Sequence, residues 1–136
     1  MANVLYPKAK EDFLAGNLNL SSNTVTIALV DTGVYTFNTA HEDRADVPNS
    51  AVVATANLAS KTITSGVFDA ADVTFTSVTG ANCEALIIYH TDVQGGNTSS
   101  RLIAYVDSAS GLPILPNGGD ITVRFSTGAS KIFALF

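Results

Sequence analysis

The sequence predicts a mainly β protein, an antiparallel β-sandwich or barrel-like fold with one or two short helices near the N-terminus. Short runs of β-branched and apolar residues recur at roughly 10–15-residue spacing, with polar or Gly-containing turns between them. Charged residues make up 14% of the chain, against about 25% in an average soluble domain. A chain of 136 residues suits one core, so residues 1–136 are predicted to form a single domain.

Two short helices are expected in the first 50 residues. Pro7 suits the first helical position, where a missing N–H costs nothing, and Gly16 suits the left-handed residue just past a helix end. In the later segment TAHEDRADVP, Thr39 and Glu42 have the spacing of a capping box. Pro48 would end that second helix.

The first strand is expected at residues 25–30, with one deeply buried face and another that is at least partly covered. Three short β-rich runs follow, AVVATANL, KTITSGVF and DVTFTSV. In the last run, period-two alternation divides the side chains between two faces. One face is predicted to hold Val73, Phe75 and Ser77, and the other Thr74, Thr76 and Val78.

The strongest strand signals are CEALIIYH and RLIAYVD, near-continuous apolar runs typical of central strands covered on both faces. TDVQGGNTSS between them is expected to be a hairpin loop, and Asn117-Gly118-Gly119 indicates a tight turn. The segments ITVRF and KIFALF are then predicted to pair with each other across STGAS as a closing hairpin.

The final residues are strongly apolar on both alternating faces. Ile132, Phe133, Leu135 and Phe136 lie within the last five positions. Two arrangements remain open: a final strand in the protein's own sheet, or a tail that adds to the sheet edge of another subunit. In both cases we expect deletion of residues 132–136 to impair folding or assembly.

The acidic clusters do not predict a metal site. His41, Glu42 and Asp43 are consecutive, so on a helix they point about 100° apart and cannot converge. We expect a solvated helix start there, with the acids favoured by the helix dipole. Asp69 and Asp72 are two acids where a calcium loop needs about six oxygen ligands, so a turn before a strand is expected.

Cys83 and His90 are the remaining candidates for chemistry. Their odd separation along one strand places them on opposite faces, and His90 is expected to be a half-buried residue at a strand end. Neither a phosphate-binding loop nor a G-x-S-x-G motif is present. The sequence therefore predicts a protein that is not an enzyme and uses no cofactor and no metal.

Charge and hydropathy also predict which partners are absent. The net charge is −5 and the seven Lys and Arg residues are scattered, whereas nucleic-acid binding relies on clustered basic residues. No apolar run approaches the roughly 18 residues of a membrane span, and the first ten residues lack the apolar region of a signal peptide. We expect neither a nucleic-acid nor a membrane partner. The weakly charged surface suits a compact Ser/Thr-rich domain or a subunit of an assembly.

The order of motifs resembles a group of small tailed-bacteriophage virion proteins. The resemblance covers nearly the whole chain, in LYPKAKEDFLAG, VTIALVDTGVYTFN, HEDRADVP, ITSGVFDAADVTFTSVTGANCEALIIYH, SRLIAYVDSASGLPILPNGGDITVRF and KIFALF. Here DTGVYTF lacks the second acid usual before the tyrosine in that group, which we expect to change only a loop.

The resemblance implies a non-enzymatic capsid decoration (cement) protein that binds the outer capsid and stabilises the contacts between capsomers. Its implied partners are the major capsid protein and further copies of the chain, as a dimer or trimer. Its implied location is the virion capsid surface, after synthesis in the host cytoplasm. The alternative is a receptor- or glycan-binding module or adaptor on a tail or fibre, using the loops TDVQGGNTSS and SASGLPILPNGG.

Large apolar side chains are the expected assembly contacts. For each of them a place in the core is the alternative, and for Phe13 the core is favoured. The predicted interface residues are Tyr6, Phe13, Tyr35, Phe37, Phe133, Leu135 and Phe136.

Overall fold

Antiparallel sheets make up most of the structure, a computed structural model that describes residues 4–16, 18–21, 24–90, 100–107, 112–125 and the backbone of 133–134. One α-helix and two 3-10 turns accompany the strands. In chain order the elements are β1 (Val4–Leu5), α1 (Pro7–Ala15), β2 (Val25–Val30), η1 (Arg44–Asp46), η2 (Asn49–Ala51), β3 (Val52–Asn57), β4 (Thr62–Thr64), β5 (Val67–Asp69), β6 (Val73–Phe75), β7 (Ala85–His90), β8 (Arg101–Val106), β9 (Ile121–Val123) and β10 (Phe133–Ala134).

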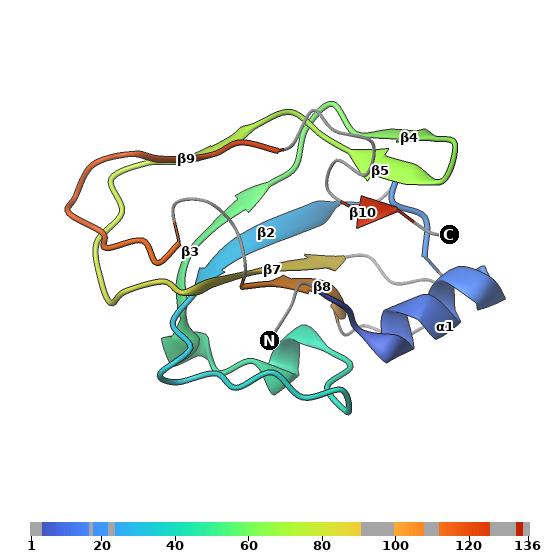
Figure 1. The fold of residues 1–136 in the computed structure, drawn as a ribbon, viewed down its shortest axis with the longest axis horizontal. Helices are drawn as coiled ribbons and strands as arrows, with labels where there is room; N and C mark the ends of the chain where they lie inside the picture. Colours follow the sequence, from blue (N-terminus) through green and yellow to red (C-terminus); the bar gives the residue numbers. More distant parts are fainter. Residues whose placement is uncertain are drawn as a thin grey trace.

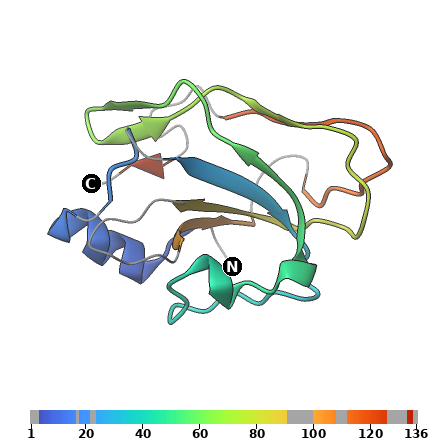
Figure 2. The same ribbon diagram turned by 180° about the vertical axis from the view of Figure 1, so that it is seen from behind.

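A five-stranded sheet in the order β1-β8-β7-β2-β3 forms the middle of the molecule. The smaller sheets β10-β5-β4 and β6-β9 lie on one side of it, and α1 with the two 3-10 turns lies on the other (Figures 1 and 2). Because both sides are covered, every residue of β2 and β7 is buried. The predicted sandwich-like β class and the doubly covered central strands are confirmed. The described strands do not close into a barrel, since the large sheet ends at β1 and β3.

The helix α1 begins and ends where the sequence predicts. Pro7 occupies its first turn, and Gly16 follows its last residue with φ of +77° and donates its N–H to the carbonyls of Asp12 and Phe13. The N–H of Tyr6 donates to the carbonyl of Ile103 in β8 over 2.9 Å. This bond fixes the start of the helix against the sheet.

The second predicted helix is absent from residues 39–48. The capping box there joins Asp43 and Asp46 around the single 3-10 turn η1, and not Thr39 and Glu42. The reason is that this segment runs beside the start of β8, where Asp43 forms an isolated β-bridge with Arg101. Backbone groups that a helix would bond internally are bonded to a neighbouring strand.

The alternation predicted for DVTFTSV holds only in its first half. Val73 and Phe75 are buried and Thr74 is exposed, but Ser77 is exposed and Val78 is buried. Ser77 has a φ of +49°, which turns the chain and reverses the faces beyond it.

The closing hairpin is also a wrong prediction. β9 pairs with β6, and β10 pairs with β5, so the two segments lie in different sheets. Phe133 and Ala134 lie opposite Phe68 and Val67 of the same chain, which confirms the own-sheet arrangement for these two residues. Residues 91–99 of the loop predicted at 91–100 lie outside the described residues, although the strands that flank the loop are antiparallel neighbours.

The tight turn at residues 117–119 is confirmed. Gly118 has a φ of +88°, a left-handed conformation that glycine adopts without steric cost. The Asn117 side chain accepts the N–H of Gly119 over 3.0 Å. This turn precedes β9 and delivers the chain to the outer layer.

Candidate functional site

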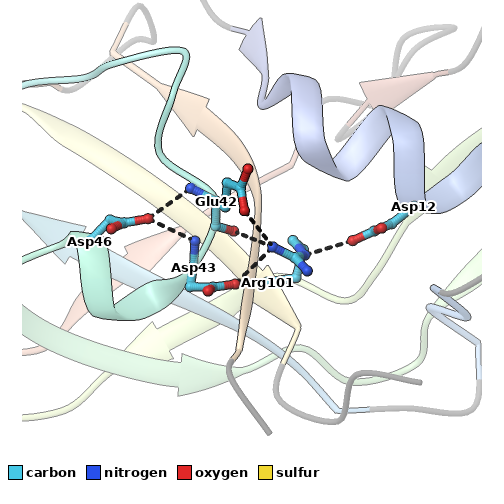
Figure 3. A network of polar contacts seen from close by, with 5 residues as sticks. All are labelled: Asp12, Glu42, Asp43, Asp46 and Arg101. Carbon is cyan, nitrogen blue, oxygen red and sulfur yellow. Dashed lines mark hydrogen bonds and ion pairs between the residues drawn. The ribbon is translucent and has the colours of Figure 1, made fainter. Parts of the chain in front are cut away.

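The densest polar cluster surrounds Arg101, the first residue of β8 (Figure 3). Its Nε lies 2.6 Å from Oδ2 of Asp12 in α1, and its Nη1 lies 2.8 Å from Oδ1 of Asp43. The same Nη1 lies 3.4 Å from the carbonyl oxygen of Glu42 and 3.8 Å from its carboxylate. We call Arg101, Asp12, Asp43 and Glu42 the arginine clamp.

The arginine clamp joins three elements that are distant in the chain. Side-chain exposure is 7% for both Arg101 and Asp12, so their charges are largely removed from water. Burial of an ion pair is costly unless geometry and extra hydrogen bonds offset the loss of hydration. The guanidinium offsets part of this loss through Nη1, which donates to Oδ1 of Asp43 and to the carbonyl of Glu42, while Nε meets Asp12 as an ion pair. The clamp therefore locks α1 and the segment before η1 against the sheet.

Asp46 holds the backbone of the same segment. Its Oδ2 accepts the N–H of Glu42 over 2.8 Å and the N–H of Asp43 over 3.0 Å. These bonds, with that from Asp43 the largest effect, lower the pKa of the Asp46 carboxyl below its usual value. The sequence predicts that the acids of this segment are solvated. In the structure, Asp43 and Asp46 have protein partners.

A hydrogen-bonded chain of three aromatic residues, Tyr6, Tyr35 and His41, lies on the same side of the large sheet as the arginine clamp. The hydroxyls of Tyr6 and Tyr35 are 2.8 Å apart, and the Tyr35 hydroxyl lies 3.0 Å from Nδ1 of His41. Phe37 packs between Tyr6 and Tyr105, with ring centroids 5.1 Å and 5.0 Å away. Burial raises the pKa of Tyr6, Tyr35 and Tyr105, so these phenols stay protonated well beyond neutral pH.

Two of the seven predicted interface residues lie in the core. Tyr6 and Tyr35 are 0% and 1% exposed, because their hydroxyls satisfy each other inside the molecule; the prediction that they form an interface is wrong. Phe13 and Phe37 are partly buried and pack against the core. The side chains of Phe133, Leu135 and Phe136 lie outside the described residues.

The candidates for chemistry are enclosed as well. Cys83 is fully buried, and burial raises its pKa to about 11, so the thiolate nucleophile is disfavoured. His90 is 0% exposed and not half-buried as predicted, because it is covered from both sides of the large sheet. Asp69 is the last residue of β5, and Asp72 lies in the short connection before β6, where it accepts the N–H of Phe125 over 3.0 Å; no hydrogen-bonded turn is assigned at residues 70–72. Within the described parts of the chain, no cluster of His, Cys, Asp and Glu is arranged to hold a metal ion.

One open hollow lies beside η1 and is lined by Arg44, Pro48, Asn49 and Tyr89, among others. The guanidinium of Arg44 stands 5.7 Å from the centre of the Tyr89 ring. It donates to the carbonyl of Val47 over 2.7 Å and to Oδ1 of Asn49 over 3.2 Å. The only cation in the lining described is thus engaged by protein groups.

The outward side of the two smaller sheets carries hydroxyl groups. Thr62 and Thr64 of β4, Thr74 of β6 and Thr122 of β9 are all exposed. The hydroxyls of Thr74 and Thr122 are 3.1 Å apart across the β6–β9 pair. We call these four uncharged residues the threonine surface; Asp69 lies opposite Thr62, and the exposed Arg124 follows β9 on the same layer. Sequence alternation indicated only Thr74 among the four.

No protein-family model and no curated protein matches the chain. Among the residues described, no helix has the length and apolar character needed to cross a membrane.

Proposed function

We propose that the protein is a non-enzymatic structural protein of a tailed-bacteriophage virion, a decoration (cement) protein that binds the outer capsid and stabilises the contacts between capsomers. The order of motifs along the chain is the basis for this class. The structural observation that supports it most is the contrast between the two sides of the molecule. The described ionic and aromatic clusters are bonded inward, whereas the outer sheets present the uncharged threonine surface.

This contrast suits a protein whose task is to hold its shape and make contacts. The arginine clamp and the tyrosine chain tie the helix and the 31–51 segment to the sheet, which stiffens the scaffold. Hydroxyl and backbone groups can pair across an interface without the large desolvation cost of charges. A contact of about 800 Å² per partner is the usual scale, and many copies on one lattice reinforce weak contacts.

The aromatic residues weigh against the glycan-binding alternative. All four tyrosines of the chain are buried, and every phenylalanine whose side chain is described is buried or half-buried. A sugar-binding platform needs exposed rings on which a sugar can stack. We therefore prefer the capsid role, with the threonine surface as the face that meets the capsid.

The first experiment measures where the protein resides. Virions of the phage that encodes it are separated into heads and tails, and copies of the chain are counted in each by quantitative mass spectrometry. Hundreds of copies in the head fraction would agree with a cement protein. A few copies confined to the tail fraction would contradict the proposal.

The second experiment tests whether the threonine surface is the face that binds the capsid. Purified protein is added to capsids that lack it, and bound copies are counted for the wild type and for Thr74→Arg. We expect the variant to bind at least several-fold less, because the new charge must be desolvated at the contact. Leu14→Arg is the matched control, since Leu14 is 90% exposed on α1, on the other side of the large sheet. Equal losses for both variants would refute the assignment of this face.

A further inference from the structure

We propose that two copies of the chain associate through the outer edge of β4, paired antiparallel about a twofold axis that passes beside Ile63. This partner, a second copy of the same chain, goes beyond the capsid role and does not rest on it. Three features of the molecule support this pairing: the geometry of the β4–β5 hairpin, the exposure of β4 and the symmetry of the β4 sequence.

The hairpin geometry determines which way the backbone of Ile63 faces. A two-residue turn at 65–66, with φ of +52° and +77°, joins β4 to β5, as in a type I′ turn. The pair that closes such a turn, Thr64 with Val67, exchanges hydrogen bonds, and the next pair does not. That next pair is Ile63 with Phe68. The N–H and C=O of Ile63 therefore point away from β5, toward the outer edge.

β4 is an edge strand in the described structure. β5 lies between β10 and β4, and no described strand pairs with the outer side of β4. All three of its residues are exposed, and Ile63 is 53% exposed. Proteins commonly protect an edge by keeping its strand short or with a charge, a proline or a bulge. Thr-Ile-Thr is short but contains no charge, proline or bulge, and Lys61 precedes it.

A second copy fits this edge because the strand is symmetric about its centre. In an antiparallel pair with the axis at Ile63, each Ile63 lies opposite its counterpart, and the two residues exchange two backbone hydrogen bonds. Thr62 of each copy then lies opposite Thr64 of the other. Cross-strand threonine pairs are favourable, and the chain already contains one, between Thr74 and Thr122.

The side chain of Ile63 adds an apolar contact to this pair. Residues opposite each other on neighbouring strands project to the same face, so Ile63 lies on the face of Phe68, which is 3% exposed. The two half-exposed isoleucines would cover one another at the rim of the two cores. β4 itself contains no carboxylate, and Asp69, which lies opposite Thr62 on β5, is separated from the second copy by the width of β4.

A three-residue strand pair is small beside the roughly 1,200–2,000 Å² of a stable interface. We therefore expect a weak dimer in solution. Copies fixed side by side on a lattice would pair far more completely, because their effective concentration is in the millimolar range.

Cysteine cross-linking tests the interface and its register. Opposite residues have Cα atoms about 5.5 Å apart in a hydrogen-bonded pair, as for the two Ile63 residues, and about 4.5 Å apart in a non-hydrogen-bonded pair, as for Thr62 and Thr64. Both distances are within the range of a disulfide, whereas diagonal neighbours at about 7–8 Å lie beyond it. Under mild oxidation Ile63→Cys should form a disulfide dimer alone. Thr62→Cys and Thr64→Cys should each stay monomeric alone and cross-link when mixed. Thr74→Cys, equally on the outer layer, is the control, and wild type with its buried Cys83 is the background.

We expect Ile63→Cys to dimerise about tenfold faster than Thr74→Cys, because pairing raises the effective concentration of its thiols. Equal rates would overturn the proposal, as would a mixture of Thr62→Cys and Thr64→Cys that cross-links no better than either alone.

In sedimentation velocity, Ile63→Lys should remove the concentration-dependent association of the wild type with little change in melting temperature. A wild type that stays monomeric up to about 1 mM would also overturn it. None of these readouts involves a capsid, so their failure is separate from failure of the capsid role.

Discussion

At the scale of single residues, Arg101 is the position where a substitution should have the largest effect. Arg101→Met would leave the Asp12 carboxylate buried without its cation, and loss of one member of a buried pair costs about 3–5 kcal/mol. Urea unfolding measures this change. Arg124→Met is the matched control, because Arg124 is exposed on the outer layer and such substitutions change stability by about 0.5 kcal/mol or less.

The double variant Arg101→Met/Asp12→Leu separates charge from packing. It should recover part of the lost stability, since both buried charges are then replaced by apolar groups. A double variant as unstable as Arg101→Met would show that the clamp stabilises by packing and not by charge pairing.

Cys83 is expected to be chemically inert in the folded protein. The thiol is fully buried and its pKa is raised to about 11, so at pH 8 both the thiolate fraction and access to reagent are low. Alkylation followed by mass spectrometry should show no labelling of the native protein and full labelling in urea. Rapid labelling of the native state at pH 8 would contradict the burial of this side chain.

Residues of the candidate site were predictable only where their partners are close in sequence. Tyr6 and Tyr35 are predicted at an interface because no neighbouring residue indicates that their hydroxyls bond across a separation of 29 residues. Asp12 gave no signal either, because its partner Arg101 lies in a different element. The one available signal was an arginine at the start of a strand that is otherwise apolar, a position where a buried charge requires a partner.

At the scale of elements, local sequence signals were enough to predict α1 and the central strands. They failed where hydrogen bonds to backbone groups distant in the chain determine the secondary structure. Pro7 and Gly16 mark α1 through the bonding needs of its own ends, and both faces of β7 are apolar because both are covered. The helix predicted at 39–48 fails because Leu102 donates its N–H to the carbonyl of Glu42 over 3.0 Å. The closeness of β9 and β10 in the sequence predicts that they pair with each other. Their actual partners, β6 and β5, come earlier in the chain.

The terminal strand β10 is expected to be needed for stability. β10 covers the edge of β5 beside Phe68, so deletion of residues 132–136 should expose that edge and the core behind it. We expect a lower melting temperature and concentration-dependent aggregation, the usual result of an uncovered edge strand. Thermal melts and light scattering measure both, and a peptide of residues 131–136 added in trans should restore part of the stability. A truncated chain that stays soluble with an unchanged melting temperature would refute this role for the segment.

At the scale of the whole molecule, the two sides of the large sheet have different tasks. The side with α1 and the 31–51 segment contains the ionic and aromatic clusters that hold distant parts of the chain together. The side with the smaller sheets presents strand edges and hydroxyls. Substitutions on the side with α1 should therefore change mainly folding stability. Substitutions on the side with the smaller sheets should change mainly assembly.

The folding of the whole molecule should be sensitive to alkali because of the buried phenols. Burial raises the pKa of Tyr6, Tyr35 and Tyr105 above the usual value of 10.0. Above about pH 10 the unfolded chain releases phenolic protons that the folded chain retains, so the free energy of unfolding falls as pH rises. Below that pH these groups are protonated in both states and the effect vanishes. In a Tyr89→Phe background, which leaves only these three phenols, tyrosinate absorbance should therefore increase only together with loss of the β circular-dichroism signal, and Tyr35→Phe should make the decline of stability with pH less steep. A titration of the tyrosines near pH 10 in a protein that remains folded would show that the phenols are open to water.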